Sequence, residues 1–290
     1  MKEITIISGK GGTGKTSITA ALASLAESAV YCDNDVDAAN LHLVFDPEER
    51  ESHIFEGAWQ PEISKETCTQ CGICKEYCRF DAIGTIFDGT YEINPLKCEG
   101  CRLCERVCPE SAIRSERSKN NFWYVSDSRF GILVHANMGP GEENSGKLVT
   151  VLRSQARAIA KQKNAHWIIN DGPPGIGCAA ISSITGAHLV VIVTEPTQSG
   201  FHDLKRVTDL VSSFKVPAVA IINKHDLHPP ISVDIQTYLS EHNIPVIANV
   251  PFSELFVQAI LAGKSIIEQS PEGEISLVLQ EAWEKLTSGF

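Results

Sequence analysis

The sequence has little positive charge and no long apolar run, and each absence excludes a class of function. Its 36 acidic residues outnumber 25 basic ones, for a formal net charge of −11. A broad nucleic-acid-binding surface would instead need a basic stripe. No run approaches the roughly 20 apolar residues of a transmembrane helix. The first residues already read as a buried strand, so we expect no signal peptide. We therefore predict that the chain binds neither nucleic acid nor membrane.

A glycine-rich stretch near the start has the pattern of a phosphate-binding loop. Residues 9–16 read G-x-x-x-x-G-K-T, with an apolar run typical of a buried strand before them and an Ala- and Leu-rich, helix-like segment, 17–26, after them. We predict that Lys15 neutralises the β- and γ-phosphates and that Thr16 binds Mg²⁺. A glycine-rich turn without a ligand is the alternative. The predicted nucleotide-binding residues here are Lys10, Gly11, Gly12, Thr13, Gly14, Lys15, Thr16 and Ser17.

The loop contains a second lysine, Lys10, in the sequence K-G-G-T-G-K-T. This stretch resembles the deviant phosphate-binding loop of the MinD, ParA, Mrp and nitrogenase iron-protein superfamily. In that family the early lysine crosses a dimer interface to the partner's nucleotide. The resemblance implies that Lys10 is a catalytic residue that binds ATP in trans, when two copies or this chain and a paralogous subunit close face to face. A solvated loop lysine is the alternative.

Two acidic sites follow strands further along the chain. Val30 and Tyr31 read as a short strand that leads into Asp33-Asn-Asp35, and a buried strand from Trp167 leads into Asp171-Gly-Pro-Pro-Gly. Carboxylates at the ends of strands beside a phosphate loop lie where Mg²⁺ and the attacking water bind. The resemblance implies that Asp33 and Asp35 position that water, and that Asp171 holds Mg²⁺ through water. Turn or capping aspartates are the alternative for Asp33 and Asp35, and a plain strand–turn–helix for the Asp171 segment.

Ten cysteines are unusual for a chain of 290 residues. In a small secreted domain they would predict disulfides, but this chain is long and starts with a nucleotide-binding motif. We therefore predict a reducing, cytoplasmic location in which the cysteines bind metal.

Eight of the ten cysteines form two runs with the same spacing, C-x₂-C-x₂-C-x₃-C, thirty residues apart. This internal duplication resembles a bacterial two-cluster ferredoxin, in which the fourth cysteine of each run binds the other cluster. Arg79 departs from the family, which usually has proline there, and puts the local turn in doubt. Zinc sites and disulfides are the alternatives. The resemblance implies one [4Fe–4S] cluster on Cys68, Cys71, Cys74 and Cys108, and another on Cys98, Cys101, Cys104 and Cys78.

The rest of the chain alternates strands and helices, which predicts parallel strands with crossover helices. By resemblance, Asn223 reads the adenine edge and the backbone near Pro251 completes the base pocket, although a turn residue is the alternative for Asn223. We interpret Cys178 as a buried or interfacial thiol; a cluster shared across a dimer is the alternative. We predict a strand pair over 123–134, a loop over 135–141, helices over 145–163, 200–214, 231–240 and 275–286, and strands over 189–194, 218–222 and 246–250.

Together these patterns predict an α/β fold, a P-loop NTPase with a mostly parallel sheet flanked by helices. We expect an ATPase domain over 1–60 and 117–290, interrupted at 61–116 by a small α+β ferredoxin-like domain. The predicted function is an ATP-hydrolysing iron–sulfur protein with ATP, Mg²⁺ and two [4Fe–4S] clusters as cofactors, in which dimer closure is coupled to electron transfer to an unknown redox partner. An iron–sulfur scaffold or carrier of the Mrp type is the alternative.

Overall fold

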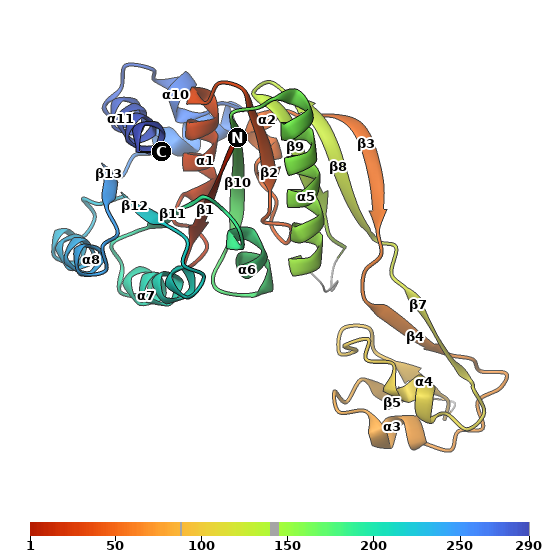
Figure 1. Cartoon of the computed structure of the whole chain (residues 1–290). Helices are drawn as coiled ribbons and strands as arrows, with labels where there is room; N and C mark the ends of the chain where they lie inside the picture. The colour runs from red at the N-terminus through yellow and green to blue at the C-terminus, as the bar shows by residue number, and fades with distance from the viewer. Residues whose placement is uncertain (88, 140–144, 290) are drawn as a thin grey trace. The chain divides into compact units, whose positions relative to one another are not determined.

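A computed structural model describes residues 1–87, 89–139 and 145–289 (Figure 1). The chain divides into two compact units. We call the first the sheet unit; it comprises Met1–Ser52, Trp123–Asn137 and Ser145–Phe290. We call the second the cysteine unit; it comprises His53–Phe122 and Met138–Asn144, and it contains both cysteine runs.

The sheet unit is built on a nine-stranded sheet in the order β13-β12-β11-β1-β10-β2-β9-β8-β3. All pairings from β13 to β9 are parallel. Parallel strands with covered faces are apolar along their whole length, and every residue of β11 is buried. The strands are β1 (Lys2–Ser8), β2 (Ala29–Asp33), β3 (Glu48–Phe55), β8 (Asn121–Ser128), β9 (Gly131–Asn137), β10 (Trp167–Pro174), β11 (Leu189–Thr194), β12 (Ala218–Asn223) and β13 (Val246–Val250).

Helices cover both faces of this sheet, because side chains alternate along each strand. In β1, Ile4 and Ile6 pack with α1 (Lys15–Leu25), α10 (Ile266–Gln269) and α11 (Glu274–Ser288), whereas Ile7 packs with α7 and α8. This confirms the predicted fold class. No described helix is long and apolar enough to cross a membrane. The other helices of the sheet unit are α2 (His42–Phe45), α5 (Ser145–Lys163), α6 (Cys178–Ile184), α7 (Gln198–Ser213), α8 (Pro229–Glu241) and α9 (Leu255–Leu261).

The loop predicted over 135–141 is wrong for its first three residues, because His135–Asn137 continue strand β9. His135 and Ala136 are held there by packing: Ala136 is buried, and the His135 ring stacks on Tyr124 of the neighbouring strand. Residues 140 and 141 of that loop lie outside the described residues. The sequence also did not predict β3, whose charged, mostly exposed residues carry no apolar alternation.

The cysteine unit repeats a strand–helix–strand pattern. The first copy is β4 (Trp59–Ile63), α3 (Ile73–Tyr77) and β5 (Ile83–Thr85), and the second is β6 (Tyr91–Ile93), α4 (Leu103–Val107) and β7 (Ile113–Arg117). Its two small sheets pair β4 with β7 and β5 with β6, both antiparallel. Each sheet therefore takes one strand from each copy, so that the two copies interlock rather than fold side by side.

Candidate functional site

The phosphate-binding motif forms the turn between β1 and α1, as predicted. Its backbone requires glycine, since Gly12 (φ 81°) and Gly14 (φ 85°) are left-handed. At position 14 a Cβ atom would lie 2.3 Å from the Nδ2 atom of Asn223. The same amide donates a hydrogen bond of 2.8 Å to the carbonyl oxygen of Thr13. Asn223 thus fixes the shape of the loop from the neighbouring strand end.

Lys15 and Thr16 converge on one buried carboxylate, that of Asp171 in the second half of β10, which continues to Pro174. The Lys15 Nζ atom lies 3.0 Å from Asp171 Oδ1, and the Thr16 hydroxyl donates to Oδ2 at 2.7 Å. Thr19 also donates to Oδ1, at 2.8 Å. Burial alone would lower the pKa of Lys15, but Asp171, Asp35 and Asp33 more than offset it and raise that pKa above its ordinary value. A hydroxyl and a carboxylate side by side are oxygen ligands of the kind that Mg²⁺ prefers.

Asp33 and Asp35 lie beside this group at the end of β2. Asp35 Oδ2 is 3.5 Å from Lys15 Nζ. Asp33 is fully buried, and its two carboxylate oxygens accept hydrogen bonds from the backbone amides of Asp35 (3.2 Å) and Leu41 (3.2 Å). Burial, reinforced by the negative charge of Asp171, raises the pKa of the Asp33 carboxyl well above that of a free aspartic acid. The hydrogen bonds that Asp33 accepts from Asp35 and Leu41 order the turn after β2, beside the Lys15 ammonium group.

Lys10 is bound within its own chain, by other partners than those of Lys15. Its Nζ atom lies 2.6 Å from Glu195 Oε1, and it donates to the hydroxyls of Thr197 and Ser199, both at 3.1 Å. Sequence reasoning missed Glu195, although it directly follows the predicted strand 189–194. The rule that found Asp33 and Asp171, polar residues at strand ends beside a phosphate loop, could also have found it.

A cavity of about 220 Å³ lies next to the loop, beyond Ser17 and Asn223. Phe252 and Phe256 contribute aromatic walls, and such walls suit a planar base. Pro251 is not among the lining residues, although its neighbour Phe252 is. Asn223 uses its side-chain nitrogen on Thr13 and its oxygen on the Lys224 amide. The full lining is Ser17, Asn223, Lys224, Phe252, Ser253, Phe256, Val257 and Ile260.

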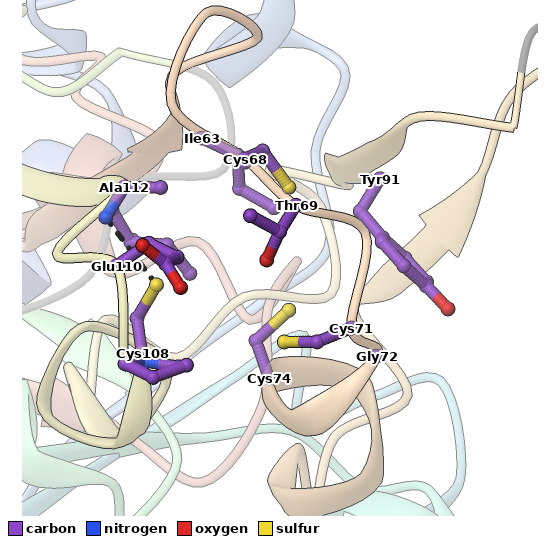
Figure 2. A pocket seen from close by; sticks show the side chains of 12 residues that line it. Ile63, Cys68, Thr69, Cys71, Gly72, Cys74, Tyr91, Cys108, Glu110 and Ala112 are labelled. Carbon is purple, nitrogen blue, oxygen red and sulfur yellow. Dashed lines mark hydrogen bonds between the residues drawn. The ribbon is translucent and has the colours of Figure 1, made fainter.

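The eight cysteines of the cysteine unit form two groups of four around two separate cavities. Cys68, Cys71 and Cys74 of the first copy line one cavity with Cys108 of the second copy. Figure 2 shows these four side chains turned toward one common space between the loops. The other cavity is lined by Cys98, Cys101, Cys104 and Cys78. The structure thus brings together each of the two sets that the sequence suggests.

Both cysteine loops share one backbone conformation, which shows how the duplication shapes them. The pairs Gln70 and Gly100, Gly72 and Arg102, and Asp81 and Ser111 all have positive φ angles. Helices α3 and α4 end at Cys78 (φ −76°, ψ 109°) and Cys108 (φ −72°, ψ 112°), which are nearly identical. Arg79, which replaces the usual proline after Cys78, therefore leaves the turn geometry unchanged.

Six of the eight cysteines are buried or half-buried, whereas Cys71 and Cys101 are exposed. Burial raises the pKa of Cys74 and, to about 11, that of Cys104. The Cys108 sulfur accepts a hydrogen bond of 3.3 Å from the Ala112 amide, the kind of contact that tunes thiolate ligands of a cluster. Among the described residues, no three His, Cys, Asp or Glu side chains converge closely enough to bind a single metal ion. A four-thiol set around a shared cavity fits the donor chemistry of an iron–sulfur cluster.

The two remaining cysteines lie in the sheet unit. Cys178 is exposed at the first residue of α6, so of the two predicted environments the buried one is wrong, and the interfacial one stays a prediction. Cys32 is fully buried in β2 and donates to the Asn34 side chain at 3.0 Å.

Most of the chain matches the model of a known protein family. The model of the CobQ/CobB/MinD/ParA nucleotide binding domain matches residues 4–266. The chain belongs to this family. Among solved structures, this CobQ/CobB/MinD/ParA-family chain is similar in fold to the septum site-determining protein MinD of Pyrococcus horikoshii, in complex with Mg-ADP. Its TM-score is 0.59 at 17% identity, over 98% of this chain and 95% of that one.

Relatives that match in sequence include a protein of similar length and two that match only part of the chain. The uncharacterized protein MJ0578 of Methanocaldococcus jannaschii is 33% identical over 98% of this chain and 96% of its own length. An iron-sulfur cluster carrier protein of Rickettsia bellii is 37% identical over 33% of this chain and 31% of its own. Pyruvate synthase subunit PorD of Thermotoga maritima is 43% identical over 20% of this chain and 61% of its own.

Proposed function

We propose that this chain is an ATP-hydrolysing iron–sulfur protein in which ATP-driven closure of a dimer is coupled to electron transfer through two [4Fe–4S] clusters. The observation that carries the proposal is the pair of cross-copy cysteine sets in a chain of the CobQ/CobB/MinD/ParA family. Residues 61–116 would be an inserted ferredoxin domain within the ATPase domain, 1–60 and 117–290.

Each charged residue of the nucleotide site has a role in this proposal. Lys15 binds the phosphates in cis, and Lys10 reaches the nucleotide of a second subunit, either another copy or a paralogous chain. Thr16 and Asp171 would hold Mg²⁺, which supplies charge neutralisation at the phosphates. Asp33 and Asp35 orient the attacking water. The direct contact of Thr16 and Lys15 with Asp171 keeps these groups together in the protein alone.

The base site is part of the same proposal. The cavity beyond Ser17 would hold adenine between Phe252 and Phe256, with Asn223 and the backbone after Pro251 at its edge. Because Asn223 also fixes the loop through Thr13, base recognition and loop shape share one side chain.

The cysteine unit would hold its clusters through the two sets described above. When bound, such clusters supply one-electron transfer. The protein contributes the spacing of the thiols, their partial burial and backbone hydrogen bonds such as that from Ala112 to Cys108. These features would tune the reduction potentials of the clusters, but they do not themselves transfer electrons.

A cluster carrier is the second candidate, and the match to the Rickettsia bellii carrier protein favours it. The Mrp-like carriers that the chain resembles use a C-x-x-C pair after the ATPase core, and no such pair follows Cys108 in this sequence. A full set of four cysteine ligands for each cluster also favours retention over delivery.

The two candidates separate in one experiment. Protein purified under strictly anaerobic conditions should contain about eight iron and eight sulfide per chain, as expected for two [4Fe–4S] clusters. The clusters should survive incubation with an apo-acceptor protein and ATP, and should be reduced and reoxidised reversibly. Stoichiometric zinc with iron near zero would reject the iron–sulfur assignment. Rapid transfer of cluster to the acceptor would favour the carrier.

A further inference from the structure

Lys10 has a complete set of partners in its own chain. Its ammonium group has three donors, and the structure supplies three acceptors: Glu195 Oε1 at 2.6 Å and the hydroxyls of Thr197 and Ser199 at 3.1 Å. Thr197 is itself fixed, because it accepts from the Gly200 amide as the N-cap of α7. Lys10 therefore occupies a built binding site at the junction of β11 and α7.

Glu195 is the centre of that site. Its side chain is 10% exposed, and its second oxygen, Oε2, lies 2.8 Å from Lys224 Nζ, which also donates to the Gly12 carbonyl at 3.0 Å. Burial alone would raise the pKa of the Glu195 carboxyl, but hydrogen bonds from Lys10 and Lys224 more than offset it and keep that pKa below its usual value. The Glu195 carboxylate thus contacts Lys10 of the phosphate loop directly and reaches the Gly12 carbonyl of the same loop through Lys224.

We propose that Glu195 is a positioning residue that holds Lys10 on its own subunit and must release it before two subunits close on ATP. This inference rests on the proposed function, because it needs Lys10 to act across a dimer. All three N–H groups of Lys10 are used within its own chain, so binding a phosphate of the partner subunit must displace at least one of these contacts, and in this proposal the Glu195 ion pair is the one exchanged. Closure therefore exchanges the carboxylate for a phosphate, at both halves of a symmetric dimer.

The exchange makes closure depend on ATP itself. A phosphate chain carries more negative charge than one carboxylate and attracts the ammonium group more strongly. Without nucleotide, no phosphate replaces the Glu195 carboxylate. Lys10 therefore stays paired with Glu195, and the subunits stay apart. Glu195 thus disfavours a nucleotide-free dimer, a form of specificity obtained by stabilising the competing state.

The test compares association of Glu195→Gln and wild type. With a non-hydrolysable ATP analogue and Mg²⁺, sedimentation velocity should show the variant dimerising at least about fivefold more tightly, since even a partly exposed ion pair contributes up to about 1 kcal/mol. Ser199→Ala removes one hydrogen bond from Lys10 at an exposed position and should act in the same direction, more weakly. Glu281→Gln, which makes the same charge change at an exposed site on α11, should match wild type.

A second measurement tests the pairing itself in nucleotide-free protein. A double-mutant cycle of Lys10→Ala and Glu195→Gln on thermal unfolding should show a non-additive term, because each single change already removes the ion pair. Association is compared at saturating nucleotide, so that any effect of Glu195→Gln through Lys224 and the loop, measured as ATP affinity of the dilute, monomeric protein, is separated from release of Lys10. A merely structural lesion would lower both stability and association, whereas release of Lys10 raises association.

The outcomes distinguish this inference from the proposed function. Unchanged or weaker dimerisation of Glu195→Gln, with Lys10-dependent dimerisation of wild type, would overturn the inference alone, as would additivity in the cycle. If wild type and Lys10→Ala associate and hydrolyse ATP equally, the proposed role of Lys10 fails, and the inference fails with it.

Discussion

In the sheet unit, strands such as β11 are buried along their entire length between two layers of helices, whereas the cysteine unit has very little apolar interior. Its hydrophobic cluster contains three buried residues, Cys74, Ile83 and Ile113, around which partly buried side chains pack. Several of those are themselves ligand candidates: Cys78, Cys104 and Cys108. A domain below about 70–80 residues rarely gains more than ~3–5 kcal/mol from such a core. The comparison shows that aliphatic packing holds the first unit, and it predicts that the second depends on a group bound by its cysteines.

The largest expected effect tests that dependence. Cys74→Ala removes both a buried core side chain and a candidate ligand, so we expect loss of one cluster's iron and of protease resistance across His53–Phe122. The sheet unit should keep its fold and its ATP affinity. Iron analysis, limited proteolysis and ATP binding of the same preparation provide the measurement.

The duplication supplies a matched control. Cys104→Ala, thirty residues on, should remove the other cluster with the same consequences, and Cys178→Ala, at an exposed position in the sheet unit, should remove no iron. A cysteine unit that resists proteolysis equally well in Cys74→Ala would show that the comparison between the units is mistaken.

The second effect distinguishes the two lysines of the sheet unit. Lys15 is 6% exposed and paired with Asp171, so Lys15→Ala leaves a buried carboxylate uncompensated and should abolish measurable ATP binding. Lys10 lies outside that group, so Lys10→Ala should bind ATP within about threefold of wild type. Its hydrolysis should fall by at least about a hundredfold, since a cation acting in trans on phosphoryl transfer contributes ~10³–10⁵.

Isothermal titration and a phosphate-release assay on the two variants make this comparison, with Lys264→Ala, an exposed lysine of the α9–α10 turn, as the control. Wild-type hydrolysis by Lys10→Ala would contradict the assignment across a dimer.

A smaller effect concerns pH and the packing of the sheet unit alone. Burial, with a contribution from His42, lowers the pKa of His135 to about 4, against 6.5 for the free side chain. Between these values the unfolded chain binds a proton that the folded chain does not, so stability is complete above pH 6.5 and falls as pH drops toward 4. The loss approaches ~3 kcal/mol at most.

The loss is measured as the melting temperature between pH 7 and pH 5, before most carboxylates titrate. His135→Gln should flatten this slope while the midpoint at pH 7 changes little, because the glutamine amide can donate to or accept from the Ser126 hydroxyl, which lies 2.9 Å from the ring Nε2 atom. Equal slopes would mean that His135 is protonated in the folded protein.

Sequence reasoning succeeded where a pattern has a single physical cause. The loop of residues 9–16 and the buried strands followed from glycine spacing and apolar runs, and helix 145–163 and strands 189–194 and 246–250 match the structure to the residue. The cysteine groups followed from the duplication. What spacing could not give is the direction of a side chain. The Lys10 side chain binds Glu195, and the Asn223 side chain binds the Thr13 carbonyl. Both partners are distant in sequence, so spacing along the chain could not predict them. Strand β3 could not be predicted either, because its mostly exposed residues show no alternation of apolar and polar side chains.

The smallest expected effect decides whether the two units are independent at all. If closure of an ATP-bound dimer changes the charge, hydrogen bonding or exposure around the clusters, their reduction potentials should differ with and without ATP. For a one-electron couple a shift of ~60 mV corresponds to about 1.4 kcal/mol, an ordinary coupling energy. Linkage requires the reverse, so reduced and oxidised protein must bind ATP with affinities that differ about tenfold.

This coupling can be measured without turnover. Asp33→Asn should bind ATP and remain closed, because asparagine can still accept one of the Asp35 and Leu41 amides through its single oxygen but does not act as a carboxylate toward water. Anaerobic redox titrations of this variant with and without ATP give the shift, and Lys10→Ala, which should bind ATP without closing, gives the control. Potentials that agree in all states, with ATP affinity that ignores redox state, would show that the units share a chain but no equilibrium. ATP could then act only by bringing a redox partner to the clusters.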